Sequence, residues 1–295
     1  MSYSWRLFLA LITVYIVWGS TYLGIRFALE GGFPPFWLGG IRFLLAGSLM
    51  YAVLRVRGYA HPTPQQWLNC ALMGFLMLAM GNGMVNTAQQ YVSSGVTAVA
   101  VASSALWIAL FATLRGERSS STEWLGLAIG FAGIILLNLG GELSASRIGL
   151  IALMIAPVSW AFASIWSRGR NLPPPFMAAA AQMLCASVFM LAIGFFKGEQ
   201  FAAWPTGSGW LALGYLLLFG SIFAYSSYVW LLQNARPALV GSYAYVNPVI
   251  AVILGMLLAN ERPSSKDFVA IVVILGGVLL ITLSKTLNKT RKKTP

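Results

Sequence analysis

Charged side chains are scarce in this sequence. Only 9% of its 295 residues are Asp, Glu, Lys or Arg, whereas 58% are hydrophobic. A soluble domain carries about 25% charged residues, so a soluble chain of this length would lack the residues to cover its own surface. The hydrophobic residues also occur in long blocks, unlike the alternating or amphipathic runs of a soluble core. The composition therefore predicts an integral membrane protein.

Residues that bind metals or perform catalysis are also few. The two cysteines, Cys70 and Cys185, and the single histidine, His61, give neither a disulfide framework nor a metal-ligand spacing. No nucleophile–base pair and no phosphate-binding GxxxxGK[ST] motif occurs. We therefore expect no cofactor, no metal site, no ATP-driven pump and no enzyme. The net charge of +12 lies in loops and the tail, which indicates a topological role and not a nucleic-acid partner.

Ten hydrophobic segments approach the roughly 20 residues that a helix needs to cross the hydrocarbon of a bilayer. The expected spans are 7–25, 36–54, 67–86, 93–114, 124–139, 148–167, 176–196, 209–232, 239–258 and 268–287. With a cytoplasmic N-terminus, the inner segments hold thirteen Lys and Arg residues and the outer segments hold five. Both termini are therefore predicted to be cytoplasmic. The basic tail, 288–295, is interpreted as an anchor near anionic lipid.

The two halves of the chain resemble each other. Pro34-Pro35-Phe36 recurs as Pro174-Pro175-Phe176, 140 positions later, and the stretch from Trp18 (WGSTYLGIR) resembles the stretch from Trp160 (WAFASIWSR). Five spans per half is an odd number, so the second copy must enter the membrane from the opposite side. Such inverted repeats place a substrate site at their interface and allow alternating access. The predicted fold is an all-α membrane protein of ten transmembrane helices in two inverted five-helix repeats, 7–141 and 147–287.

Several short motifs follow one another along the chain. They are Trp18-Gly19-Ser20-Thr21, Arg42-Phe43 with Ala46-Gly47, and Glu117 and Glu261 at the repeat ends. Over about residues 7 to 287, this order resembles the EamA type of the drug/metabolite transporter superfamily. Gly81-Asn82-Gly83-Met84 and residues 242–248 resemble a branch of bacterial inner-membrane exporters. The resemblance implies a multi-pass inner-membrane protein that exports small metabolites such as amino acids, amines or related compounds.

Apart from Lys285 at the end of the last span, Arg42 is the only charged residue inside an expected span. A charge at that depth costs about 3 kcal/mol on insertion scales, so it is a candidate for binding a carboxylate or a phosphate. The structural alternative is that its side chain extends outward to the bilayer surface. Its counterpart in the second repeat is Gln182, so both halves are polar at this depth and only one is charged.

Other candidates for a substrate cavity are aromatic, amide or hydroxyl residues near span centres. They are Trp18, Ser20, Asn82, Asn86, Tyr225, Tyr243, Tyr245 and Asn247. Aromatic walls suit apolar groups, and a few polar groups orient a solute. Interhelical hydrogen bonding is the alternative role of each residue. Pro248 is expected to kink the ninth span and to act as a hinge.

The remaining features leave three hypotheses about function. No acidic residue lies well within a span, which disfavours cation efflux through a membrane carboxylate. Glu117 and Glu261 are interpreted as exposed or locally paired loop-end charges, and Gly126, Gly130 and Gly133 as a face for close helix packing. The leading hypothesis is a metabolite exporter embedded in the lipid bilayer. The alternatives are a drug or xenobiotic efflux carrier and a non-transporting membrane scaffold.

Overall fold

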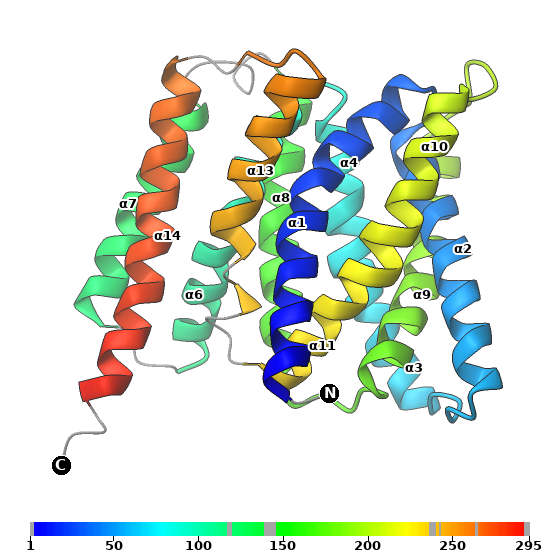
Figure 1. The fold of residues 1–295 in the computed structure, drawn as a ribbon, viewed down its shortest axis with the longest axis horizontal. Coiled ribbons are helices and arrows are strands. Elements are labelled where there is room, and N and C mark those ends of the chain that lie inside the picture. Colours follow the sequence, from blue (N-terminus) through cyan, green and yellow to red (C-terminus); the bar gives the residue numbers. More distant parts are fainter. Residues whose placement is uncertain are drawn as a thin grey trace.

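The fold is helical throughout the described part of the chain (Figure 1). The structure is a computed structural model that describes residues 3–116, 120–138, 146–235, 240–241, 243–262 and 265–291. Within these ranges, seven continuous helices are long and apolar enough to cross a bilayer. They coincide with the first four expected spans and with the sixth, seventh and eighth. The protein is therefore an all-helical membrane protein, as the composition predicts.

The residues before 139 form eight helical elements. These are α1 (Tyr3–Glu30), α2 (Pro35–Val56), α3 (Pro64–Met73), the π-helix η1 (Gly74–Asn82), α4 (Gly83–Ala88), α5 (Ser94–Ala102), α6 (Ser104–Leu114) and α7 (Ser121–Asn138). α3, η1 and α4 follow one another without a break, and Ser103 alone separates α5 from α6. We call this part the first half.

The residues after 145 form the second half. Its elements are α8 (Arg147–Trp166), α9 (Pro175–Phe196), α10 (Gly207–Tyr215), the π-helix η3 (Leu216–Tyr225), α11 (Ser226–Asn234), α13 (Tyr243–Leu258) and α14 (Ser265–Arg291). α7, α13 and α14 overlap the other three expected spans. The apolar stretches Val246–Leu258 and Phe268–Gly277 are shorter than the length that crosses a bilayer, so the count of ten spans stays a prediction.

The same local signals begin and end α2 and α9. Pro35 and Pro175 occupy the first turn of these helices, where a missing N–H leaves no hydrogen bond unmade. Gly58 and Gly198 follow the two helix ends with φ values of 82° and 68°. Glycine favours this left-handed conformation after a helix because it has no Cβ. Both helices therefore have the same 22-residue length.

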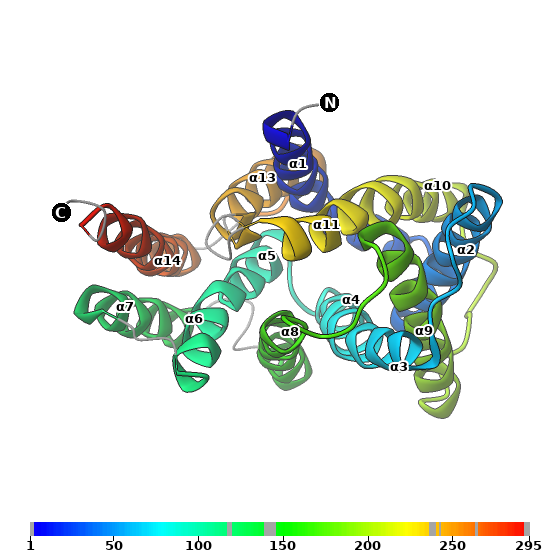
Figure 2. The ribbon, with the colours of Figure 1, turned by 90° about the horizontal axis from the view of Figure 1, so that it is seen from below.

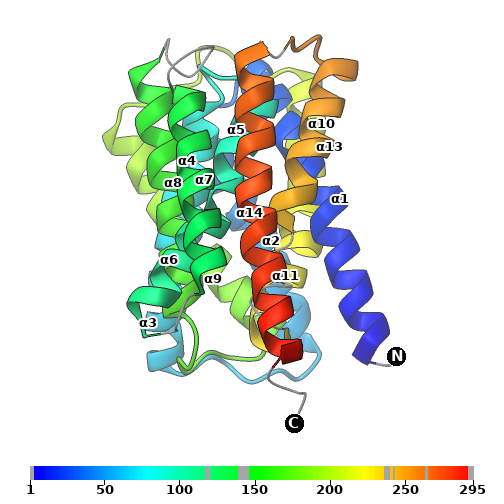
Figure 3. The same ribbon diagram turned by 90° about the vertical axis from the view of Figure 1, so that its left-hand side faces the viewer.

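The helices form one elongated bundle. α1 begins and α14 ends at the same end of it (Figure 1, Figure 3). Seen along the helices, the pair α7 and α14 lies at one side of the outline, and α2 and α9 lie at the opposite side (Figure 2). These two pairs have the most extensive helix contacts in the described part of the chain.

Small residues bring α7 and α14 together. A Cβ atom on Gly133 would lie 2.9 Å from the backbone nitrogen of Ile274. One on Gly277 would lie 2.5 Å from the nitrogen of Gly130 and 2.7 Å from the carbonyl oxygen of Gly126. Backbones approach this closely only where side chains are absent. The predicted packing role of the three α7 glycines is therefore confirmed.

The two π-helices occupy corresponding places in the halves. η1 ends at Asn82 and η3 ends at Tyr225, 143 positions later (225 − 82). η1 packs against α8 and α9, and η3 packs against α1 and α2. π-helical segments are rare, and many of them lie at functional sites.

Candidate functional site

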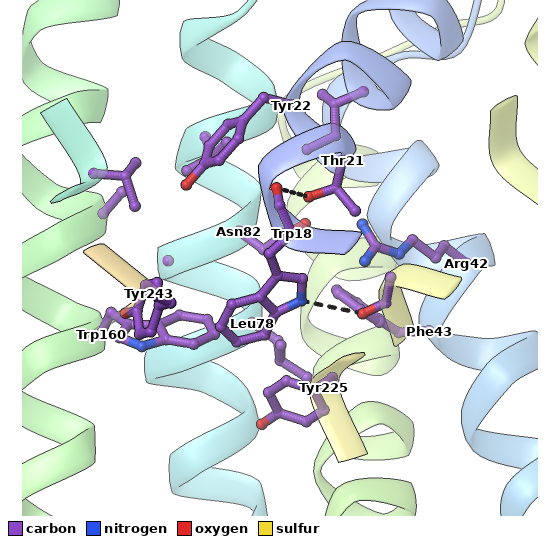
Figure 4. Close-up of a pocket in the computed structure, with 16 residues that line it drawn as sticks. Trp18, Thr21, Tyr22, Arg42, Phe43, Leu78, Asn82, Trp160, Tyr225 and Tyr243 are labelled. Carbon is purple, nitrogen blue, oxygen red and sulfur yellow. Dashed lines mark hydrogen bonds between the residues drawn. The ribbon is translucent and has the colours of Figure 1, made fainter. Parts of the chain in front are cut away.

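A cavity lies among the central helices and is lined by both halves (Figure 4). α1, α2, η1, α4 and α5 contribute from the first half, and α8, η3 and α13 contribute from the second. The cavity volume that water molecules can occupy is about 70 Å³ in this conformation, less than the roughly 300–1,000 Å³ of sites that enclose a drug-sized ligand. Its walls are mostly apolar and aromatic with a few polar groups, as in small-molecule sites. The cavity therefore has the chemical character of a site for a small solute.

Trp18 of α1 lies in the middle of an aromatic cluster. The centroid of its ring is 5.4 Å from that of Trp160 of α8, 4.9 Å from that of Tyr228 of α11 and 5.4 Å from that of Tyr243 of α13. Its Nε1 donates to the carbonyl oxygen of Gly220 at 3.3 Å (Figure 4). Each such ring pair stabilises by about 0.5–1.5 kcal/mol beyond its buried area. The cluster therefore joins both halves and holds the aromatic wall in place.

Arg42 of α2 lines the same cavity and is only 3% exposed. Its Nε donates to Oγ of Ser221 on η3 at 2.7 Å, and its guanidinium carbon lies 4.9 Å from the ring centroid of Phe43. Its Nη1 is buried and has no hydrogen-bond partner. Among the described residues, no carboxylate pairs with Arg42. The guanidinium therefore remains in the cavity instead of extending to the bilayer surface, and it has a donor left for an anionic group.

Asn82 and Tyr225 end the two π-helices and line the cavity from opposite halves. Oδ1 of Asn82 is buried without a hydrogen-bond partner, so an acceptor is left over. The hydroxyl of Tyr225 donates to Oε1 of Gln182 at 2.5 Å. Gln182 is fully buried on α9, and its Nε2 contacts Sδ of Met73 at 3.4 Å. Gln182 therefore supports Tyr225 from behind and does not line the cavity.

Two further predicted residues, Ser20 and Asn86, lie outside the cavity lining. Oγ of Ser20 is 2.6 Å from the hydroxyl of Tyr215 on α10. Nδ2 of Asn86 donates to the carbonyl oxygen of Pro35 at 3.0 Å and so joins α4 to the start of α2. Both side chains make the interhelical hydrogen bonds that were the alternative to a site role.

Asn247 on α13 also lies outside the cavity lining. Its side-chain amide, in the orientation that satisfies its neighbours, donates to the carbonyl oxygens of Tyr15 at 3.0 Å and Tyr243 at 3.3 Å. The side chain of Tyr245 lies outside the part of the chain that the structure describes. α13 continues as a helix on both sides of Pro248, so a hinge there stays a prediction.

Comparison with known proteins identifies the family. The family model of the EamA-like transporter family matches residues 5–139 and again residues 147–283. The chain belongs to the EamA-like transporter family. It is 48% identical over 282 residues to the inner membrane transporter YedA of Escherichia coli (strain K12), which covers 95% of this chain and 92% of YedA. The resemblance found in the sequence motifs is therefore confirmed.

More distant proteins are also similar to this EamA-like transporter over nearly the whole chain. A transporter of Archaeoglobus fulgidus is 25% identical over 280 residues, which cover 93% of this chain and 96% of the relative. A protein with a solved crystal structure superposes with a TM-score of 0.68 at 23% identity, over 95% of this chain and 96% of that chain. The fold similarity thus extends over nearly the whole chain, and the family makes the protein a membrane transporter.

In this EamA-like transporter, the cavity contains half of the predicted site residues: Trp18, Arg42, Asn82, Tyr225 and Tyr243. The sequence analysis missed Trp160 and Tyr22, which also line it. The repeat aligns Trp160 with Trp18 and so contained the signal for the first of them. Nothing in the sequence distinguishes Tyr22 from the other aromatic residues of its helix.

Glu261 corrects one expectation of the sequence analysis. It is a buried residue, and its Oε1 accepts a hydrogen bond from Nη1 of Arg26 at 2.6 Å, across 235 positions of the chain. Burial raises the pKa of this carboxyl, but hydrogen bonds from Ser94, Arg26 and Gly95 outweigh burial and hold the pKa below its usual range. Glu261 is therefore neither exposed nor locally paired. Glu117 lies outside the described residues.

Proposed function

We propose that this chain exports small, carboxylate-bearing organic solutes. It moves them across the bacterial inner membrane by alternating access through the cavity. The observation that carries the proposal is Arg42, a buried cation whose Nη1 is unpartnered within an aromatic cavity. A buried charge without a partner is costly, and charges retained within membrane spans typically belong to substrate paths. The proposed solute supplies the missing partner.

The proposed frame is ten spans in two inverted repeats, 7–141 and 147–287, with 288–295 as a basic cytoplasmic tail. Three observations support it. The family model matches the chain twice. α1 begins and α14 ends at the same end of the bundle, as an even number of crossings requires (Figure 1). The contacts between the halves are also symmetric: η1 of the first half packs against α8 and α9, the first two helices of the second half, and η3 of the second half packs against α1 and α2, the first two helices of the first half.

The polar groups of the cavity suggest the chemistry of the solute. The guanidinium of Arg42 suits a carboxylate through its parallel N–H donors, and Oδ1 of Asn82 suits an ammonium or amide N–H. The faces of Trp18 and Trp160 suit an apolar side chain or an ammonium group. Amino acids and related metabolites combine these groups. An amine without an anionic group would meet the positive charge of Arg42 with nothing to offset it.

Location and orientation follow from the family and from charge. The name of YedA places that relative in the inner membrane, and we propose the same membrane for this chain. The thirteen inner Lys and Arg residues support cytoplasmic termini. Export is the direction that the family resemblance implies.

Efflux from proteoliposomes tests the proposal. Vesicles are loaded with amino acids, with the amines that lack only the carboxylate, and with unrelated apolar drugs, and losses are compared with protein-free vesicles. We expect saturable loss of one class of carboxylate-bearing solute. Equal loss of the matching amine would contradict the role of the carboxylate, and loss of drugs alone would favour a drug carrier. Retention of every compound by folded protein would favour a non-transporting scaffold.

A further inference from the structure

Glu261 connects three segments of the chain through its two carboxylate oxygens. Oε1 accepts from the backbone nitrogen of Ser94 at 2.8 Å, from its hydroxyl at 2.7 Å and from Nη1 of Arg26 at 2.6 Å. Oε2 accepts from the backbone nitrogen of Gly95 at 3.1 Å. Glu261 belongs to the second half, whereas Arg26, Ser94 and Gly95 belong to α1 and α5 of the first. A single side chain therefore joins the two halves.

The end of α13 directs Glu261 into this position. The backbone nitrogens of Ala259 and Glu261 both donate to the carbonyl oxygen of Gly255, at 3.0 and 3.1 Å. Asn260 between them has a φ of 51°, the left-handed conformation that commonly ends a helix and that asparagine tolerates better than most residues. A Cβ on Gly255 would fall on the carboxylate of Glu261, so the glycine leaves space for the side chain.

The electrostatics favour the carboxylate in this slot. The first N–H groups of α5 have no partner within their helix, and the positive end of the helix dipole lies there. Arg26 adds a full positive charge and also pairs with Glu30 at 2.7 Å. Glu30 is exposed and lies on the same helix as Arg26, so that second ion pair does not join the halves.

The Glu261 cluster lies at the end of the bundle opposite to the start of α1. Arg26 is near the C-terminal end of α1, which lies at the end of the bundle opposite to the start of α1 (Figure 1), and Ser94 begins α5. Ile25, next to Arg26, and Val101 of α5 line the cavity. α1 and α5 both form walls of the cavity. Beyond the cavity, the cluster therefore joins these two helices of the first half to Glu261 of the second half.

We propose that Glu261 is a latch that closes the non-cytoplasmic end of the transport path and that opens when the halves move apart. This inference rests on the proposed alternating access. The latch holds while that end is closed, and its hydrogen bonds to Ser94, Gly95 and Arg26 separate when the solute is released on that side. Glu261 then acts on transport through the position of α5 and α1 and does not contact the solute.

Cysteine accessibility tests the latch without any knowledge of the solute. The probe is Val101→Cys in a chain whose own cysteines are replaced, Cys70→Ser and Cys185→Ser. A membrane-impermeant maleimide is applied from the periplasmic side of intact cells, and the labelling rate is measured. We expect Glu261→Gln to raise this rate by about tenfold, because the loss of a charged hydrogen-bond network shifts the equilibrium toward the open state by about that factor.

A matched control removes the other carboxylate that pairs with Arg26. Glu30→Gln leaves the contact between the halves intact, so labelling should not change. Ser94→Ala removes one of the four hydrogen bonds to Glu261 and should give an intermediate labelling rate. This variant replaces Glu261→Gln in the test if Glu261→Gln does not fold. Unchanged labelling in Glu261→Gln and Ser94→Ala, with a lower melting temperature, would show a static brace and overturn the latch. This result would leave the proposed transport standing, since flux is measured separately.

Discussion

Arg42 and Ser221 join the two halves of the chain at the wall of the cavity. Nε of Arg42 on α2 donates to Oγ of Ser221 on η3 at 2.7 Å. The Ser221 hydroxyl donates in turn to the carbonyl oxygen of Leu216 at 3.3 Å, five residues earlier in the π-helix. The π-helical register therefore positions the hydroxyl that holds Nε, and Nη1 of Arg42 is left for a solute.

Ser221→Ala should weaken solute binding without unfolding the protein. Without the hydroxyl, Nε loses its partner and the guanidinium is positioned less well. We expect the KM for the transported solute to rise by about tenfold while the maximal rate changes little. The control is Ser20→Ala, whose hydroxyl contacts Tyr215 outside the cavity lining and whose loss should leave KM unchanged. Equal effects of the two substitutions would contradict the positioning role of Ser221.

Trp18→Ala should destabilise the protein because three aromatic neighbours lose their common partner. A Trp→Ala change in a packed core costs about 3–5 kcal/mol. Trp18→Phe keeps a ring in the cluster but loses the hydrogen bond to Gly220, which should lower the free energy of unfolding by about 1 kcal/mol. Thermal unfolding in detergent measures both, and Trp204→Ala, at an 82% exposed position, is the control with little effect. Equal stability of Trp18→Ala and Trp204→Ala would show that the cluster does not join the halves.

The hydrogen bonds of Glu261 should make part of the stability depend on pH. Its pKa is lowered in the folded protein, so its contribution is fully present above the ordinary value of 4.5 and is lost as the pH falls through the folded-state pKa. Arg26 pairs with Glu261 directly, Glu30 shares that arginine, and Arg262 follows Glu261 in the chain. At pH 7, Glu261→Gln should melt below the wild type, and the difference should disappear as the pH falls below 4.5. A difference that stays constant with pH would contradict this prediction.

Gly255→Ala should disrupt the same cluster through sterics alone. The added Cβ would meet the carboxylate of Glu261, and the strain should cost about 1–3 kcal/mol. Gly214→Ala is the matched control, because a Cβ there meets nothing within 4 Å and alanine favours a helix by about 1 kcal/mol. Melting temperatures should therefore shift in opposite directions. A shift of the same sign in both variants would argue against the slot at Gly255.

The sequence predicted the helical membrane fold because the signal is local. Hydrophobic length acts within one segment, and α2 and α9 contain the expected spans 36–54 and 176–196. The depth of Arg42 in a span left two expectations for its side chain, burial or extension to the bilayer surface, and the structure shows it buried. The π-helices η1 and η3 were not predicted, because a π-helix differs from an α-helix only in hydrogen-bond register.

The partners of individual polar residues could not be read from the sequence. Asn82 and Asn86 are one helical turn apart, yet only Asn82 lines the cavity, because Asn86 lies farther along the helix and donates to the carbonyl oxygen of Pro35. Glu261 looked like a loop-end charge because its partner Arg26 lies 235 positions away. Contacts between residues so far apart in the sequence depend on how the halves pack against each other, and no local sequence pattern specifies them.

Arg42→Gln tests the central proposal most directly. Efflux of the carboxylate-bearing solute from proteoliposomes is compared among the wild type, Arg42→Gln and Arg57→Gln, which removes the same charge from the exposed end of α2. The account predicts that Arg42→Gln loses about tenfold or more of the efflux, whereas Arg57→Gln keeps it. Full efflux by a folded Arg42→Gln protein would contradict the proposed role of Arg42 in binding the solute.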